Sequence, residues 1–312
     1  MRIITFILTT LFLLVFTILG LIIYLLWHYG KELPDYRQLA KYEPSIVTRV
    51  HAGDGALLSE YSIQKRVFVP IEVIPKNITN AFLSAEDKDF FKHFGLDLRA
   101  TFRAVIINLK NYGSGKRLVG ASTITQQVAK NFLLSSEVSF ERKIKEAILA
   151  IRMERAFSKN QILELYLNEI YLGNNSYGVA AAALNYFDKS LDDLNIAESA
   201  FLAGLPKAPS KYNPAKNYKK TLDRRNWVLE KMYQNRYIDF EQKNASKKTE
   251  IIIKSSSGLD DASAPYFAEE VRRALLNKFG FKKLYEGGLS VRTTLDPYLQ
   301  IIAEDALTIG LE

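Results

Sequence analysis

The chain has 312 residues, of which 48% are apolar and 12% aromatic, with no Cys, three His and a formal net charge of +8. The lack of thiols excludes a disulfide-stapled module and a zinc or iron–sulfur centre ligated by cysteine. A wholly disordered chain is excluded as well, because this apolar content can bury enough surface to offset the ordering entropy. The length predicts one large domain or two ordinary ones.

The first segment predicts a membrane anchor. Residues 3–27 form a run of 25 residues without a charge, and as a helix of about 1.5 Å per residue they exceed a hydrocarbon core of about 30 Å. A cleaved signal peptide is the main alternative, but its apolar core is usually about 7–15 residues and ends in small residues. Tyr24, Trp27, His28 and Tyr29 stand here instead, as in an interfacial aromatic belt.

Charge bias does not orient this anchor. Arg2 and the α-amino group on one side face Lys31, Arg37 and Lys41 on the other, so positive-inside counting leaves both topologies open. A basic domain beside a membrane suits anionic headgroups or phosphates better than nucleic acid.

Polar residues 28–44 predict a stalk, punctuated by Pro34 and Pro44. Apolar–polar alternation on both sides of a Gly-Asp-Gly turn then predicts a small β-hairpin or meander. The expected strands are 46–51, 56–63 and 66–71.

Residues 78–234 have helical periodicity, which predicts a mainly α body. An amphipathic helix is expected over 139–157. Ser158 and Gln161 form a capping-box pattern that begins the next helix, which we expect Gly173 to end. A further helix over 194–203 should end at Gly204.

The pattern weakens after residue 242. The Lys-, Ser- and Thr-rich residues 243–257 predict a linker or flexible loop. A helix near 266–279, a strand at 288–294 and a new helix after Asp296-Pro297 are expected beyond it.

Two polar clusters near the start of the helical body could carry chemistry. Glu86-Asp87 is followed by aromatic residues and His93, and a carboxylate beside apolar rings can act as a general base. Ser122 and Thr123 enter a helix and can offer hydroxyl and backbone N–H groups to an anion or a sugar. Taken alone, the first cluster is better explained as a charged, capped helix end, and an ordinary Ser/Thr N-cap remains a credible explanation of the second.

Three further clusters follow. Arg142, Lys143 and Glu146 can point into one cleft from one helix face, where the cations would suit a diphosphate, although a solvated charged face is as plausible. Residues 164–173 and 203–214 combine aromatic residues, Asn and Gly in a way that fits sugar stacking, with much of both segments expected as scaffold.

Together and in order, the clusters resemble the peptidoglycan glycosyltransferase domain (glycosyltransferase family 51) of class A penicillin-binding proteins. The resemblance covers about residues 45–235. The matching motifs are Glu86-Asp-x-x-Phe90-x-x-His93-x-Gly95, Gly120-x-Ser122-Thr123-Ile124-Thr125-Gln126-Gln127, Arg142-Lys143-x-x-Glu146, Glu164-x-Tyr166-Leu167-Asn168 with Gly173, and Ala203-Gly204-Leu205-Pro206.

The resemblance implies a mainly α, lysozyme-like fold with a small β-hairpin or jaw region behind one N-terminal transmembrane helix. The expected organisation is a cytoplasmic tail and anchor (1–27), a stalk (28–44), the glycosyltransferase domain (45–242), and a linker with the truncated start of the region leading to a transpeptidase domain (243–312).

The resemblance also implies an inverting reaction in which lipid II is polymerised into β-1,4-linked glycan with release of undecaprenyl diphosphate. Glu86 would be the general base for the acceptor 4-hydroxyl, Lys143 would stabilise the departing diphosphate with Arg142 and Lys130, and Glu146 would be the second carboxylate. The substrate-binding residues would be Asp87, Phe90, His93, Ser122, Thr123, Gln127, Lys130, Asn131 and Arg142. No cofactor is certain; a divalent cation, Mg²⁺ or Mn²⁺, is left open at the diphosphate, with no metal ligands assigned.

Since lipid II is polymerised outside the cytoplasm, the resemblance implies a single-pass protein of the cytoplasmic (inner) membrane, with its N-terminus inside and its catalytic domain periplasmic or extracellular. The expected partners are lipid II, the growing glycan chain, the membrane and proteins of a cell-wall synthesis complex, with no nucleic acid.

The C-terminal residues 287–297 resemble the connection to a transpeptidase domain, which needs S-x-x-K, S-x-N and K-T-G. The only S-x-x-K is Ser62 to Lys65, in the strand region; Ser158-Lys159-Asn160 fits a helix cap, and K-T-G is missing. We therefore expect no transpeptidase activity, from a fragment or a shortened form of a bifunctional enzyme.

Two other functions compete with glycosyl transfer. A lysozyme-like lytic glycosidase also uses one Glu in a helical cleft, but cleaving a glycan releases no diphosphate for Arg142 and Lys143 to bind. A non-catalytic membrane scaffold has no need of Glu86 and Glu146.

Overall fold

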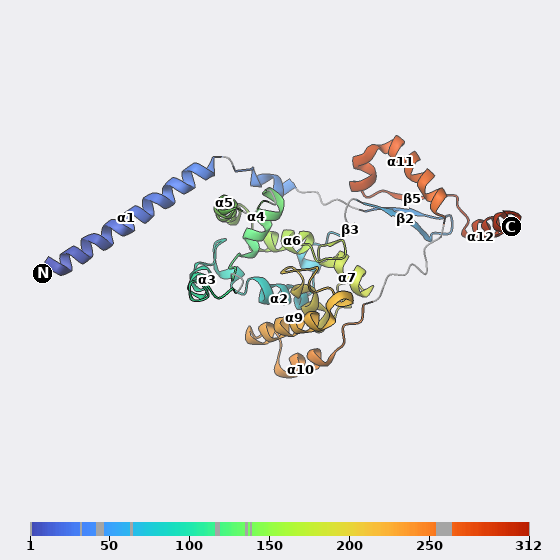
Figure 1. The fold of residues 1–312 in the computed structure, drawn as a ribbon. Helices are drawn as coiled ribbons and strands as arrows, with labels where there is room; N and C mark the ends of the chain where they lie inside the picture. The colour runs from blue at the N-terminus through green and yellow to red at the C-terminus, as the bar shows by residue number, and fades with distance from the viewer. Residues whose placement is uncertain are drawn as a thin grey trace. The chain divides into compact units, whose positions relative to one another are not determined.

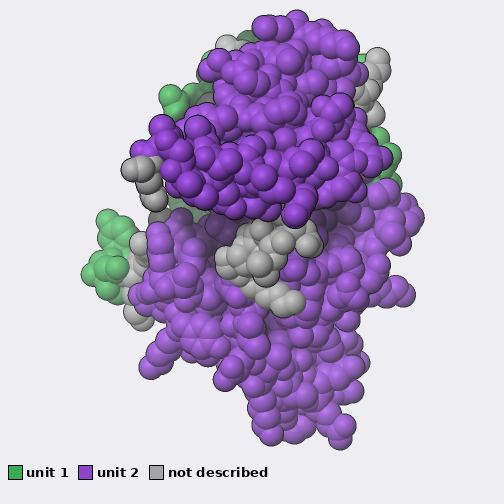
Figure 2. All heavy atoms as spheres, turned by 90° about the vertical axis from the view of Figure 1, so that its right-hand side faces the viewer, with its two compact units in different colours: residues 1–42, 86–166 green, residues 43–85, 167–312 purple. Residues whose placement is uncertain are grey.

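A computed structural model describes residues 2–31, 33–41, 47–62, 65–115, 119–134, 137, 139–253 and 264–311. The chain divides into two compact units, residues 1–42 with 86–166 and residues 43–85 with 167–312 (Figure 2). Both are built mostly of helices, which confirms the mainly α prediction. The lysozyme-like character and the domain boundaries stay predictions.

The first unit begins with α1 (Arg2–Gly30), a single helix that is long and apolar enough to cross a membrane (Figure 1). Its last turn packs against α5 (Phe140–Ala156), where Arg152 Nη2 donates a hydrogen bond to the carbonyl of Gly30 over 3.1 Å. The last carbonyls of a helix have no partner within it, so this arginine caps the end of α1.

The other elements of the first unit are η1 (Tyr36–Lys41), η3 (Phe90–Lys92), α3 (Leu98–Lys110), α4 (Ile124–Leu133) and α6 (Lys159–Glu169), whose last turn passes into the second unit. α4 packs against α5, and Val128 of α4 and Leu149 of α5 are both almost fully buried. Ser158 and Gln161 cap the start of α6 as predicted. α6 ends at Glu169, before the expected stop at Gly173.

Gly95 holds a close approach between the segment before α3 and the backbone of α5. It adopts a φ of +89°, and a Cβ there would lie 2.8 Å from the carbonyl carbon and oxygen of Ala150. Its own carbonyl accepts a 2.6 Å hydrogen bond from Thr123 Oγ1. Only glycine combines this φ with this contact.

The Gly95→Ala substitution should therefore lower the free energy of unfolding by about 2–4 kcal/mol, from backbone strain and a steric clash. Gly113→Ala is the matched control, because Gly113 has a similar φ of +80° but nothing within 4 Å of its Cβ position. Thermal denaturation of both variants gives the comparison, and equal losses would contradict the argument from close contact.

The second unit contains two sheets and the remaining helices. Its elements are β1 (Thr48–His51), β2 (Leu57–Tyr61), β3 (Lys65–Arg66), η2 (Ile71–Val73), α2 (Lys76–Glu86, of which only Glu86 belongs to the first unit), β4 (Ser176–Tyr177), α7 (Val179–Phe187), α8 (Ile196–Gly204), α9 (Pro214–Gln234), α10 (Phe240–Lys248), α11 (Pro265–Glu286), β5 (Ser290–Arg292) and α12 (Pro297–Leu311).

The predicted hairpin is present as antiparallel β1 and β2, but its third strand comes from the far end of the chain. β5 pairs parallel with β1, and α11 packs on both hairpin strands (Figure 1). These elements enclose their own apolar core, formed by Val50, Ala52, Leu58, Ala264, Ala268, Leu275, Leu284 and Leu295. Of the expected strand 66–71, only Arg66 is in β3, which pairs with β4.

The expected linker after residue 242 is wrong for its first six residues, which continue helix α10. Asp239 and Gln242 form a capping box at its start, and Lys243 and Lys247 both pair with Glu230 of α9 over 3.3 Å. The buried Arg225 of α9 donates to the carbonyls of Lys247 and Thr249 at the end of α10. Residues 254–257 of the expected linker lie outside the described residues.

The other C-terminal predictions are confirmed as elements with different bounds: the helix is α11, the strand is β5 and the new helix is α12. Part of one pattern considered above, Ile63-Gln64 of S-x-x-K, lies outside the described residues.

Candidate active site

Glu86 is the last residue of α2 and has a half-buried side chain. Gln127 on the first turns of α4 donates from Nε2 to Glu86 Oε2 over 2.9 Å. Because an amide N–H stabilises a carboxylate without neutralising it, this contact fixes the orientation of Glu86 and leaves it able to accept a proton.

A second carboxylate, Glu146 on α5, is almost fully buried, at 1% exposure. Lys143 Nζ contacts its Oε2, and Arg142 Nε lies 3.2 Å from its Oε1. Lys143 Nζ also donates to Ser122 Oγ over 2.7 Å. Both oxygens of Glu146 are thus enclosed by cations, and Glu146 serves to position them.

Lys130 on α4 connects the two carboxylates electrostatically. Burial lowers the pKa of its ammonium below the usual value; the charges of Arg142 and Lys143 also lower this pKa, while those of Glu146 and Glu86 raise it. Two carboxylates and three cations therefore act on one another within the first unit. Such a cluster can remove a proton on one side and hold a multiply charged anion on the other.

Asp87, the residue after Glu86, is buried, at 6% exposure. Its carboxylate lies 3.0 Å from His93 Nε2 and accepts a 3.0 Å hydrogen bond from the backbone N–H of Ile124, the first residue of α4. Asp87 therefore ties the residue next to Glu86 to the N-terminus of the helix that carries Gln127 and Lys130.

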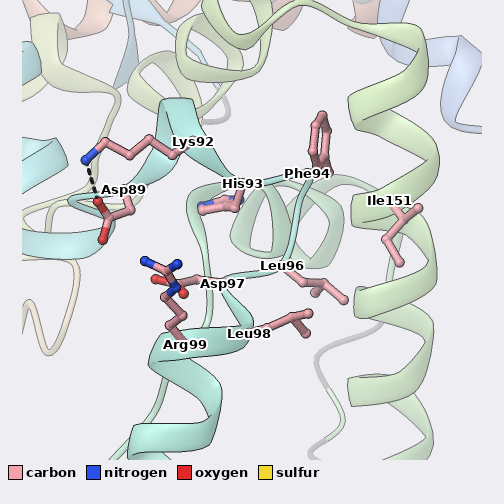
Figure 3. A pocket seen from close by; sticks show the side chains of 9 residues that line it. All are labelled: Asp89, Lys92, His93, Phe94, Leu96, Asp97, Leu98, Arg99 and Ile151. Carbon is pink, nitrogen blue, oxygen red and sulfur yellow. Dashed lines mark hydrogen bonds and ion pairs between the residues drawn. The ribbon is translucent and has the colours of Figure 1, made fainter.

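His93 also lines a cavity of about 660 Å³ between its own segment and α5 (Figure 3). The apolar side chains of Leu96 and Leu98 point toward Ile151 of α5, while Lys92 and Asp89 pair at the rim over 3.0 Å (Figure 3). The polar atoms of Glu86 and Glu146 are not part of this wall.

The structure divides the predicted substrate-binding residues into two groups. Phe90 and Thr123 are buried, at 0% and 2% exposure, and the carboxylate of Asp87 is held by His93 and the backbone of Ile124. These three side chains therefore support the site from behind and offer no exposed surface to a ligand. The predicted residues with exposed or half-buried surface are His93, Ser122, Gln127, Lys130, Asn131 and Arg142. Substrate contact stays a prediction for this second group.

Two supporting groups were not predicted. Glu154 of α5 accepts from Thr125 Oγ1 over 2.6 Å and from Lys159 Nζ over 2.7 Å, and that ammonium lies 4.3 Å from the centre of the Phe90 ring. Tyr166 is buried, which raises the pKa of its phenol well above the usual value, and the charges of Glu86 and Asp87 raise it further. The sequence signal that could have placed Tyr166 near Glu86 and Asp87 is its position in the fourth motif.

From residue 167 onward the fourth motif, like the whole fifth motif, belongs to the second unit, where Asn168 and Leu205 support the fold. The Asn168 amide exchanges two 2.8 Å hydrogen bonds with the backbone of Val69, and Leu205 is fully buried. Lys207 is exposed.

The carboxylates of the cluster do not fit a divalent cation as they stand. Among the described residues no three His, Asp or Glu side chains come together, and both oxygens of Glu146 face cations, which would repel Mg²⁺ or Mn²⁺.

Comparisons with known proteins agree on one family. Residues 54–233 match the family described as Transglycosylase. "Penicillin-binding protein 1A" of Rickettsia prowazekii is 48% identical over 92% of the chain, and the protein of that name from Aquifex aeolicus is 43% identical over 94%. The chain spans about 37% and 39% of the length of these relatives.

A solved structure agrees with this. The crystal structure of penicillin-binding protein 1A from Haemophilus influenzae aligns with a TM-score of 0.52 and 29% identity, over 85% of this chain and 29% of that one.

Proposed function

Since the chain belongs to the Transglycosylase family, we propose that it is a peptidoglycan glycosyltransferase that polymerises lipid II into glycan strands. The observation that carries the proposal is one charged cluster. In it Lys130 interacts electrostatically with Glu86 and with Glu146, and Glu146 is paired with Arg142 and Lys143. A base beside concentrated positive charge suits a hydroxyl nucleophile and a diphosphate leaving group.

In the proposed reaction Glu86 accepts the proton of the 4-hydroxyl of the incoming lipid II. The oxygen forms a bond to the anomeric carbon of the growing chain while the bond from that carbon to the diphosphate breaks, with inversion at carbon. Undecaprenyl diphosphate leaves with the electron pair. Lys143, Arg142 and Lys130 hold its charge, because a diphosphate leaves readily only when its developing charge is stabilised.

We further propose that α1 anchors the protein in the cytoplasmic membrane with the transferase outside. The length and composition of α1 support the anchor, and the extracytoplasmic location of lipid II polymerisation supports the orientation. A cysteine introduced in the exposed Lys219 position would be labelled by a membrane-impermeant reagent in whole cells if this orientation is correct.

The test of the proposed activity is incubation of the detergent-solubilised chain with lipid II and, separately, with lipid-free peptidoglycan. We expect glycan polymer from lipid II and no cleavage of peptidoglycan. Cleavage without polymer would make the protein a lytic glycosidase. Inactivity of the folded chain on both substrates would favour a scaffold.

The pH profile gives an independent check on Lys130. Its lowered pKa means that the ammonium loses its proton at a lower pH than a free lysine, whose pKa is about 10.4. The decrease of activity at alkaline pH should therefore have its midpoint below that value. In Lys130→Arg the charge persists to higher pH, because a guanidinium does not titrate there. The alkaline limb of kcat/KM should therefore move upward, and an unchanged limb would remove Lys130 from the diphosphate site.

A further inference from the structure

A second cationic site lies where the chain leaves α1. Arg37 of η1 and Arg152 and Arg155 of α5 line one cavity of about 530 Å³. The rest of its wall is the segment from Leu33 to Tyr36. None of these residues belongs to the cluster around Glu86 and Glu146.

The charge of this cavity is strongly unbalanced. Three guanidinium groups face one carboxylate, Asp35, whose Oδ1 already accepts a 3.0 Å hydrogen bond from the backbone N–H of Arg37. Arg152 is committed in part to the Gly30 carbonyl. Arg37 and Arg155 are exposed, and within the described part of the chain neither has an ion pair.

The depth of the cavity follows from α1. The apolar run of this helix ends at Trp27, beside which Lys31 Nζ lies 3.7 Å from the ring centre. Aromatic and basic residues at the end of such a helix lie at the level of the lipid headgroups. Arg152 fixes α5 to the last carbonyl of the same helix, so the cavity opens at headgroup depth.

We propose that this cavity binds the phosphate of an anionic phospholipid headgroup. Guanidinium groups bind phosphate oxygens in pairs, and an anionic leaflet attracts basic residues held near its surface. The bound lipid would hold α5, which carries Arg142, Lys143 and Glu146, at a constant height above the membrane. The proposal rests on α1 crossing the membrane and is independent of glycosyl transfer.

The test uses the full chain with Trp227→Phe, so that Trp27 is the only tryptophan, reconstituted in vesicles. Quenching of Trp27 by brominated phosphatidylcholine reports insertion of α1. Replacing it stepwise by brominated phosphatidylglycerol gives the relative affinity for the anionic lipid. We expect a clear preference for phosphatidylglycerol, reduced roughly 25-fold in Arg37→Gln/Arg155→Gln, at about fivefold per arginine.

The matched control is Lys219→Gln/Lys220→Gln, which removes two exposed charges from α9. It should keep the preference. An equal preference in the Arg37→Gln/Arg155→Gln variant would overturn the proposal. Loss of the preference on adding millimolar inorganic phosphate at constant ionic strength would make the cavity a site for free phosphate, and no quenching by either lipid would overturn the anchor while leaving the lipid II assay as a separate result.

Discussion

The Glu86→Gln variant should polymerise lipid II about 10²–10⁴-fold more slowly than the wild type, measured as kcat/KM. The substitution removes the proton acceptor and keeps an oxygen that can accept from Gln127 Nε2, so the fold should be retained. The loss should appear at every pH at which the wild type is active, because glutamine does not titrate.

The matched control for this variant is Glu141→Gln, which neutralises an exposed carboxylate of α5 that pairs with Lys145. We expect it to retain activity and to lose little stability, since exposed ion pairs contribute about 0–1 kcal/mol. Polymerisation by folded Glu86→Gln at the wild-type rate would show that the base has been assigned to the wrong residue.

The second large effect is expected for Lys143→Gln, which should lower kcat about 10²–10³-fold, as for other preorganised groups that stabilise developing negative charge. Lys143 is 48% exposed at its side chain while it contacts both Ser122 and the buried Glu146, so its ammonium can turn to a ligand without leaving the cluster. Lys143→Arg should recover part of the rate because it keeps the charge.

Lys110→Gln, on the exposed end of α3, is the control for removal of one positive charge from the first unit. Thermal denaturation separates the two possible roles of Lys143. If the lysine only balanced Glu146, then Lys143→Gln would lose stability and keep its rate in the folded fraction, contrary to our expectation.

Local sequence signals predicted the elements that are determined locally. Ser158 and Gln161, which exchange hydrogen bonds, stand three positions apart in the sequence and begin α6 as expected. The same kind of signal stands at Asp239 and Gln242, but the linker prediction considered only the composition of the residues that follow. Those lysines belong to a folded helix because Glu230, on another helix, pairs with two of them, which composition alone does not reveal.

The candidate site was predictable only in part, for a similar reason. Each motif alone allowed an ordinary structural explanation, and it was their order that pointed to Glu86, Lys143 and Glu146. A motif does not distinguish residues that contact a ligand from those that hold such residues in place. Phe90 and Thr123 were therefore expected at the substrate, although their burial depends on packing between segments far apart in the chain.

The pairing of β5 with β1 has a consequence for how the protein folds during synthesis. The backbone N–H of Leu289 donates to Thr48 Oγ1 across 241 residues, so one edge of β1 stays unpaired until β5 has been synthesised and has left the ribosome. At about 5–20 residues per second that interval is roughly 10–50 s. An open strand edge is a template for pairing with another chain, so nascent chains that stall between β2 and β5 should be the ones most prone to aggregate.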